Sequence, residues 1–215
     1  MVTPLPITNE SVARGYVRRT LREAPPRQQA ALRKADAGFS PTRRRRGPLF
    51  RAWIGFMDTC LQERVLHREI SGNGKHARGT WLYWEAAAEA ERFRINGAIL
   101  EARTLDLREV EMLGVTCHAL QRLFQRLRTT DPSAALTELI PAAECAAQLR
   151  VKALRHGERY QVHLQIPTAH GDAVLVWDDD VKNFVVKTWI HRDSMNDPRA
   201  WRHDQALRCA DLICV

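Results

Sequence analysis

The segment 171–191, GDAVLVWDDDVKNFVVKTWIH, most constrains the fold of this 215-residue chain. Two apolar runs rich in valine and aromatic residues flank an acidic turn, which is the pattern of a β-hairpin. The preceding segment RYQVHLQI, at 159–166, alternates apolar and polar residues and predicts a further strand. We therefore expect an antiparallel meander of at least three strands in the C-terminal part of the chain.

The segment from 49 to 113 shows mostly helical patterns. Apolar residues recur at helical spacing over 49–70, and a second helix is predicted over 80–95. The segment 96–113 is ambiguous, because AILEARTLDL alternates like a strand whereas LREVEML looks helical. We therefore expect 49–113 to be a mostly helical region.

Helix signals also occur on both sides of the meander. Thr116 is a candidate N-cap for a helix within 114–127, and Asp131 is a candidate cap for the next helix. Pro141 is expected to kink or split that second helix. A last helix is predicted over about 201–213.

These elements predict an α+β fold, in which helices pack on a twisted antiparallel sheet behind a helical, basic N-terminal region. We divide the chain into a leader with an arginine-rich linker at 1–48, the mostly helical region at 49–113, and an α+β domain at 114–215. The first part contains a helix pattern over 9–35, interrupted by APPRQ.

The positive charge of the chain is concentrated at its N-terminal end. Residues 1–50 hold eleven Arg or Lys and three Asp or Glu, whereas the remaining residues carry equal numbers of both signs. Such a leader either attracts polyanions without sequence specificity or serves as a disordered, solubilising tail. The candidate nucleic-acid-binding residues are four consecutive arginines in the linker: Arg43, Arg44, Arg45 and Arg46.

Several site and compartment classes lack their sequence signals. The five cysteines have irregular spacing with no C-x-x-C pair, so neither a disulfide framework nor a zinc site is expected. There is no P-loop pattern, and the acidic run at 178–180 fits a hairpin turn better than a metal site. No apolar run is long enough to span a membrane. We expect a soluble cytoplasmic protein with no membrane contact, no metal and no other cofactor.

The helix predicted within 114–127 carries the main candidate site. His118, Arg122 and Arg126 recur every four residues, so they share one helix face opposite an apolar stripe. The solvated face of an ordinary amphipathic helix has this appearance, and so does the floor of a positively charged cleft. Geometry alone does not separate the two interpretations.

Two features support a phosphate-handling role for this face. His118 falls in the first helical turn, where the positive helix end favours a neutral imidazole that can act as a general base. Arg122 and Arg126 have no carboxylate within the stretch, and guanidinium groups match the oxygens of a phosphodiester. They are therefore candidates for stabilising a pentacovalent phosphorane.

The stretch CHALQRLFQRL, taken together with GDAVLVWDDDVKNFVVKTWI, resembles bacterial toxin domains of the barnase–EndoU–colicin–RelE group. The resemblance is closest to members whose opening helix reads His-Ala-x-x-Arg-x-x-x-Arg and whose final strand ends near a threonine. It covers about 114–191 and implies helices on a twisted antiparallel sheet, with RNA cleavage that needs no metal. It places His118, Arg122, Arg126 and Thr188 at the site, whereas the 113 residues before it depart from the compact toxins.

Three further side chains are weighed for a second acid or base. His163 lies on the polar face of its predicted strand, where an ordinary surface histidine is also expected. Lys187 and Thr188 point to opposite faces of one strand, and alternation puts Thr188 on the side of Phe184 and Val186. Lys187 is equally typical of a solvated strand, and Thr188 of a hydroxyl at the edge of the core.

The leading hypothesis is a toxin-type endoribonuclease that cleaves RNA through attack by the 2′-hydroxyl and leaves a 2′,3′-cyclic phosphate. A neutralising antitoxin or immunity protein would then be a further partner. The alternative is a non-catalytic nucleic-acid-binding or regulatory protein, in which the basic N-terminal region contacts RNA or DNA.

Overall fold

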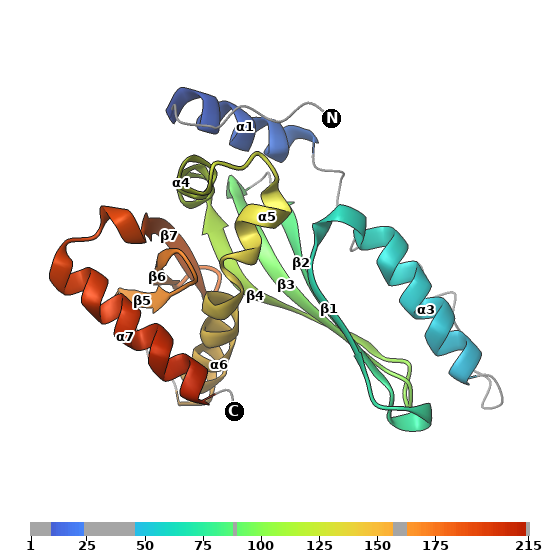
Figure 1. Ribbon diagram of the computed structural model, residues 1–215. Helices are drawn as coiled ribbons and strands as arrows, with labels where there is room; N and C mark the ends of the chain where they lie inside the picture. The colour runs from blue at the N-terminus through green and yellow to red at the C-terminus, as the bar shows by residue number, and fades with distance from the viewer. Residues whose placement is uncertain (1–9, 24–45, 88–89, 157–162, 214–215) are drawn as a thin grey trace.

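The computed structural model describes residues 10–23, 46–87, 90–156 and 163–213, with the backbone alone for 46, 156 and 206–213. Within these residues, one seven-stranded twisted sheet runs in the order β1-β2-β3-β4-β7-β6-β5 (Figure 1). Neighbouring strands are antiparallel, except that β4 and β7 are parallel. The strands are β1 (Val65–Ser71), β2 (Arg78–Ala87), β3 (Arg92–Glu101), β4 (Leu107–Thr116), β5 (Leu164–Pro167), β6 (Gly171–Asp178) and β7 (Asn183–His191).

Helices cover both faces of this sheet (Figure 1). They are α1 (Glu10–Glu23), α3 (Arg46–Leu61), α4 (Cys117–Leu127), α5 (Pro132–Thr137), α6 (Ile140–His156) and α7 (Asp197–Ile213). Together α1, α4, α5 and α6 pack on one face, whereas α3 packs on the opposite face of β2 and β3. Among the described residues, no helix combines the length and apolar composition that crossing a bilayer requires. The predicted α+β class is confirmed.

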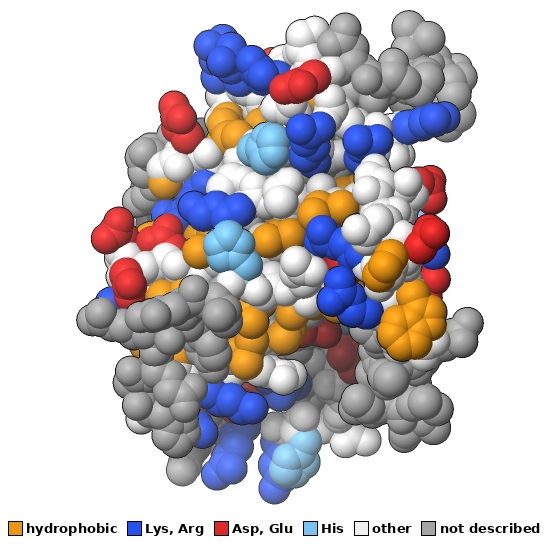
Figure 2. Space-filling model, turned by 90° about the vertical axis from the view of Figure 1, so that its left-hand side faces the viewer, with side chains coloured by type: hydrophobic (Ala, Val, Ile, Leu, Met, Phe, Trp, Pro, Cys, Tyr) orange, Lys and Arg blue, Asp and Glu red, His pale blue; other side chains and the backbone are white. Residues whose placement is uncertain are grey.

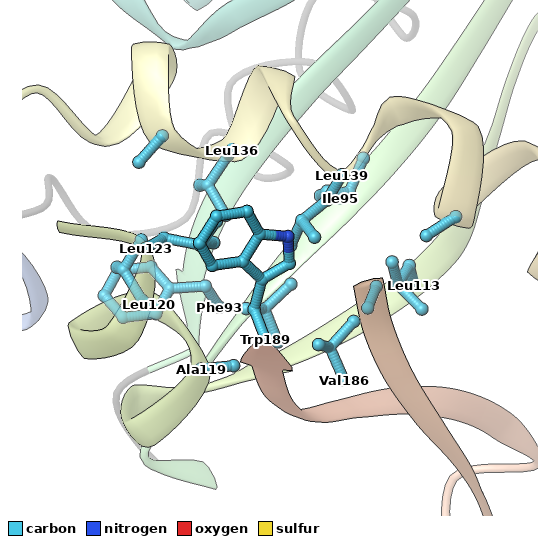
Figure 3. Close-up of a cluster of buried hydrophobic side chains, with 14 of the residues drawn as sticks. Phe93, Ile95, Leu113, Ala119, Leu120, Leu123, Leu136, Leu139, Val186 and Trp189 are labelled. Atoms are coloured by element: carbon cyan, nitrogen blue, oxygen red, sulfur yellow. The ribbon is translucent and has the colours of Figure 1, made fainter. Parts of the chain in front are cut away.

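The larger core lies between the sheet and α1, α4, α5 and α6. Trp189, only 2% exposed, projects from β7 into the centre of this core (Figure 3). The labelled side chains of the close-up come from β3, β4, β7, α4, α5 and the α5–α6 connection: Phe93, Ile95, Leu113, Ala119, Leu120, Leu123, Leu136, Leu139, Val186 and Trp189. This packing fixes α4, the helix that carries the candidate site residues, against β7.

The expectation that 49–113 is mostly helical is wrong. After α3 this region forms β1 to β4, so the helices predicted over 80–95 and for LREVEML are in fact strands. The middle of β2, WLYWE, is buried at every position because α3 covers one face while the larger core covers the other. A strand buried on both faces loses the polar–apolar alternation by which strands are recognised in a sequence.

The structure agrees more closely with the predictions for the meander and its flanking helices. Strands β5, β6 and β7 form the predicted antiparallel meander. Of the first strand, predicted over 159–166, only 164–166 belong to β5, since 159–162 lie outside the described residues and His163 precedes the strand. Asp131 caps α5 through a hydrogen bond from Ser133 N, and the predicted break near Pro141 corresponds to the separation of α5 from α6. The second half of the 9–35 helix pattern falls mostly at 24–35, outside the described residues.

A β-bulge interrupts the side-chain alternation of β7. Val174 of β6 pairs with Thr188, whereas the next residue, Leu175, pairs with Val186. Lys187 is therefore an extra residue on β7, which is the defining feature of a bulge.

The bulge changes which side chains of β7 face the helices. Trp189 joins Phe184 and Val186 in the larger core, and His191 follows on the same side of the strand. The prediction that Thr188 shares the side of Phe184 and Val186 is therefore wrong, because one inserted residue reverses the alternation beyond it.

Thr116 joins the end of β4 to α4 and β7. Its hydroxyl accepts a hydrogen bond from Ala119 N at 3.1 Å, which confirms the predicted N-cap. The same hydroxyl lies 3.0 Å from the carbonyl oxygen of Val186 and 3.1 Å from that of Lys187, to which it donates. One side chain therefore caps α4 and ties its start to the bulge of β7.

Replacing Thr116 by alanine is expected to lower the free energy of unfolding by about 1–2 kcal/mol, because both the cap and the donor to β7 are lost. Thr116→Ser keeps the hydroxyl and should recover most of that loss. Urea unfolding of the three proteins measures the difference. Equal destabilisation by serine and alanine would show that the hydroxyl contributes nothing.

Glu85 is a buried carboxyl on β2, on the same side of the sheet as Tyr83. Asn96 Nδ2 donates to Glu85 Oε2 at 3.0 Å, while Oε1 accepts no hydrogen bond from the described residues. Burial is the main cause that raises the pKa of Glu85, and Glu109 raises it further. Asn96, Arg64 and Arg94 act in the opposite direction. The ionised form of this carboxyl is therefore disfavoured in the folded protein.

Because folded Glu85 holds its proton more tightly than the unfolded chain does, its contribution favours folding at low pH and is lost as the pH rises through its folded pKa. Glu85→Gln removes this loss and is expected to raise the melting temperature by a few degrees at neutral pH. The advantage should shrink as the pH falls towards the ordinary range of a glutamate. A pH-independent difference in melting temperature would contradict this account.

Candidate functional site

The outer face of α4 carries the three predicted site residues in the expected arrangement. His118, in the first turn, and Arg126 are exposed, and Arg122 between them is half-buried. Residues one turn apart on a helix have Cβ atoms about 5–6 Å apart, so His118 is a direct neighbour of Arg122. Figure 2 shows a histidine and a row of cationic side chains at the level of α1 and α4.

An open pocket of about 460 Å³ lies beside this face of α4. Its lining comes from α1, α4, the residue that ends α4, the last residue of β7 and the turn that follows: Glu10, Arg122, Gln125, Arg126, Arg128, His191 and Asp193. We call it the arginine pocket. Arg128 enters it because it ends α4 in the left-handed conformation, with a φ of 52°.

His191 is held in a defined orientation at the pocket. Its Nδ1 accepts a hydrogen bond from Asp193 N at 3.2 Å, and its ring meets the Trp189 ring edge-on with centroids 5.6 Å apart. Its side chain is 21% exposed. When Nδ1 accepts a hydrogen bond, the neutral ring carries its proton on Nε2, which makes Nε2 a donor.

The charges of the arginine pocket are only partly balanced. Three guanidinium groups face the carboxylates of Glu10 and Asp193. Gln121 and Arg14, through hydrogen bonds, are the main causes that lower the pKa of Glu10, and the positive charge of Arg122 adds to them. Within the described chain, no ion pair joins the arginines of the pocket to a carboxylate. The pocket therefore has a net positive charge that suits an anion.

His118, one turn before Arg122, does not itself line this pocket, and neither do the remaining predicted catalytic residues. Thr188 lies on the opposite side of β7 from His191, and Lys187 is exposed at the bulge, beside the start of α4. His163 is exposed just before the edge strand β5, which lies two strands, or about 10 Å, from β7. The structure thus brings together Arg122 and Arg126, with His118 next to them, but not Thr188, Lys187 or His163.

The predicted nucleic-acid-binding run lies at the boundary of the described chain. Arg43, Arg44 and Arg45 are outside the described residues, and Arg46 begins α3. The acidic run forms a turn as expected, with Asp178 Oδ1 accepting from Asp180 N at 3.0 Å. Among the described residues, no group of three or more His, Cys, Asp or Glu side chains is placed to hold a metal ion.

Another oriented histidine lies outside the pocket. His170 Nδ1 is 2.9 Å from Glu138 Oε2, and the other carboxylate oxygen accepts from His170 N and from Thr168 Oγ1, each at 2.6 Å. Trp189 Nε1 donates to Thr168 Oγ1 at 3.1 Å. This network fastens the β5–β6 turn to the α5–α6 junction, and we assign it a structural role.

Sequence reasoning did not identify five members of the pocket, namely Glu10, Gln125, Arg128, His191 and Asp193. Glu10 lies more than 100 residues before α4, and only the packing of α1 on α4 brings it there. The sequence offered one signal for Arg128, because it directly follows Leu127, the last residue of the apolar stripe, and therefore falls at the end of the helix. The sequence alone does not place His191 at the pocket, because the direction of its side chain depends on the bulge at Lys187.

Comparison with known proteins assigns neither a family nor a function. No family model matches the chain, and no curated protein or solved structure matches it either. The functional argument therefore depends on the pocket and on the sequence resemblance given above.

Glu10 is expected to weaken anion binding at the arginine pocket, because its carboxylate competes for the same guanidinium groups. Glu10→Gln should bind pyrophosphate several-fold more tightly than the unchanged protein in calorimetric titration. Glu144→Gln makes the same charge change at an exposed position on α6 and serves as the control. Equal tightening by both variants would indicate a general effect of net charge rather than competition in the pocket.

Proposed function

We propose that this protein is a metal-independent endoribonuclease that cleaves RNA at a phosphodiester bound in the arginine pocket. The observation that carries this proposal is the convergence of Arg122, Arg126 and Arg128 with an oriented His191, beside His118. The resemblance of α4 and the meander to toxin ribonuclease domains supports the same reaction. The pocket suits one phosphate group with its adjoining sugars.

In the proposed reaction, His118 accepts the proton of the 2′-hydroxyl. The 2′-oxygen forms a bond to phosphorus, and the bond from phosphorus to the 5′-oxygen breaks. Arg122 and Arg126 stabilise the additional negative charge of the phosphorane, as guanidinium groups do at transferring phosphoryl centres. The products are a 2′,3′-cyclic phosphate and a free 5′-hydroxyl.

His191 is the best candidate for the group that protonates the leaving 5′-oxygen. His191 lies at the pocket with the arginines, and its Nδ1 is 3.5 Å from Asp193 Oδ2, which would stabilise the protonated ring. The imidazolium would donate its Nε2 proton to the leaving oxygen and return to the neutral form. Lys187, His163 and Thr188 were alternatives from the sequence, but none of them lines the pocket. An imidazole that donates a proton to the leaving group is typically worth about 10²–10⁴ in rate.

The alternative function is nucleic-acid binding without catalysis. The concentration of basic residues within 1–50 supports it, since a cationic segment binds polyanions by releasing counterions. Truncation is a poor test of this alternative, because Ala13 and Val17 of α1 are buried in the larger core. Replacing the run from Arg43 to Arg46 by glutamine leaves α1 in place and tests the contribution of the leader.

The central test compares RNA cleavage, in the presence of EDTA, by the purified protein and two histidine variants. His118→Ala and His191→Ala are each expected to lower kcat by about 10²–10⁴, the usual contribution of an acid or base. His67→Ala, an exposed histidine on β1 at the far edge of the sheet, is the control and should retain full activity. Product analysis should detect a 2′,3′-cyclic phosphate.

Each outcome decides between the two functions. Absence of cleavage by the unchanged protein in EDTA would overturn the ribonuclease proposal. Salt-dependent RNA binding that falls when the arginine run is replaced would then support the alternative. Cleavage that survives both histidine substitutions would overturn the assignment of the site.

A further inference from the structure

A second cationic site lies at the far end of the sheet, where the β1–β2 and β3–β4 hairpins turn. A pocket of about 220 Å³ is lined by Lys75, His76, Ala77, Arg78, Glu101 and Arg103. We call this end of the molecule the hairpin tip. In Figure 1 this tip lies at the lower right, beyond the end of the sheet that is farthest from α4.

Two backbone features define the shape of the hairpin tip. Gly72 has a φ of +71°, and a Cβ there would approach the carbonyl oxygen of His76 to 2.4 Å, so this turn requires glycine. Ala102 N donates to Ala77 O at 2.9 Å and joins the two hairpins to each other. These two features set the path of the backbone from which the tip presents its side chains.

The first turn of α3 anchors the same end of the sheet. Phe50 packs in one buried cluster with Ala102 and Leu105, and Ala77 contacts that cluster. These apolar contacts pack the tip against α3 without involving the charged groups of its cations. Lys75, Arg78 and Arg103 are exposed, and none of them forms an ion pair with a described residue.

The charge of the tip favours an anion. Three permanent cations and His76 surround one carboxylate, that of Glu101. In the sequence, the run from Arg43 to Arg46 leads into α3, whose first turn packs at this end of the sheet. Strand β4 separates the tip from the start of α4 by nine residue steps, or roughly 30 Å. A ligand that reaches both ends must therefore be an extended polyanion.

We propose that the hairpin tip binds the phosphate backbone of RNA, at a distance from the arginine pocket. The role of this RNA as a substrate rests on the proposed function, whereas binding itself does not. The tip supplies affinity without reading sequence, because its cations contact phosphates rather than bases. It would act on long RNA and leave a dinucleotide substrate, which occupies only the pocket, unaffected.

The test replaces Lys75, Arg78 and Arg103 by glutamine in the full chain. A matched triple variant replaces Lys152, Arg155 and Arg202, which are exposed cations on α6 and α7. Binding of a single-stranded RNA of about 30 nucleotides is measured over a series of KCl concentrations, with His118→Ala added to each protein to prevent cleavage. Thermal melting verifies that both triple variants are folded.

For single strands the logarithm of affinity falls with the logarithm of salt by about 0.7 for each phosphate neutralised. The tip variant is therefore expected to reduce this slope by about 2 and to weaken binding at low salt by at least tenfold. The matched variant should keep the original slope. Equal reductions in both variants would overturn the proposal, because they would reflect net charge alone.

Two further measurements separate this proposal from the proposed function. With His118 intact, the tip variant should raise KM for long RNA, leave kcat unchanged and cleave a dinucleotide at the normal rate. If neither the unchanged protein nor the variants with His118 intact cleave RNA, the proposed function fails. The dependence of RNA affinity on salt still decides whether the tip binds RNA. An unchanged slope on RNA, together with lost binding to polyglutamate or to anionic vesicles, would overturn RNA as the ligand.

Discussion

The contact between Thr116 and β7 determines how the rest of the site is arranged. Strands β4 and β7 pair in parallel at only Gly114–Val185 and Val115–Val186, and the Thr116 hydroxyl continues this junction into α4. A Cβ at Gly114 would lie 3.0 Å from a methyl carbon of Val185, so a small residue suits this close approach. The start of α4, and with it His118, is thereby fixed beside the bulge of β7.

The bulge at Lys187 then determines what β7 presents to α4. With regular alternation, Thr188 would face the helices and Trp189 would face away. The extra residue instead places Trp189 beneath Ala119, Leu120 and Leu123 and carries His191 to the arginine pocket. Bulges commonly redirect side chains next to functional sites. A single inserted residue therefore links the packing of α4 to the position of the second histidine.

Features that depend on residues close together in the sequence were predicted correctly, whereas features that depend on distant segments were not. Thr116 and Asp131 were identified correctly because a cap depends on residues within one helical turn, and β5 to β7 because their patterns are local. The strand β2 was misassigned because both of its faces are buried, by elements that lie far apart in the sequence. Likewise, helical spacing predicted that His118, Arg122 and Arg126 share one face of α4. That Glu10 and His191 lie beside this face depends on the packing of α1 and on the bulge of β7, which the sequence does not show.

Charge distribution bears on how the two proposed RNA contacts work together. Beyond residue 50 the chain has equal numbers of acidic and basic residues, so attraction of a polyanion depends on local clusters rather than on net charge. The arginine pocket contains two carboxylates, which weaken its field at a distance while leaving its guanidinium groups near a bound phosphate. The hairpin tip contains one carboxylate beside three cations and protrudes from the body. On the proposed function, the tip is therefore the better placed of the two to capture a long RNA first, and the pocket to select the phosphate that reacts.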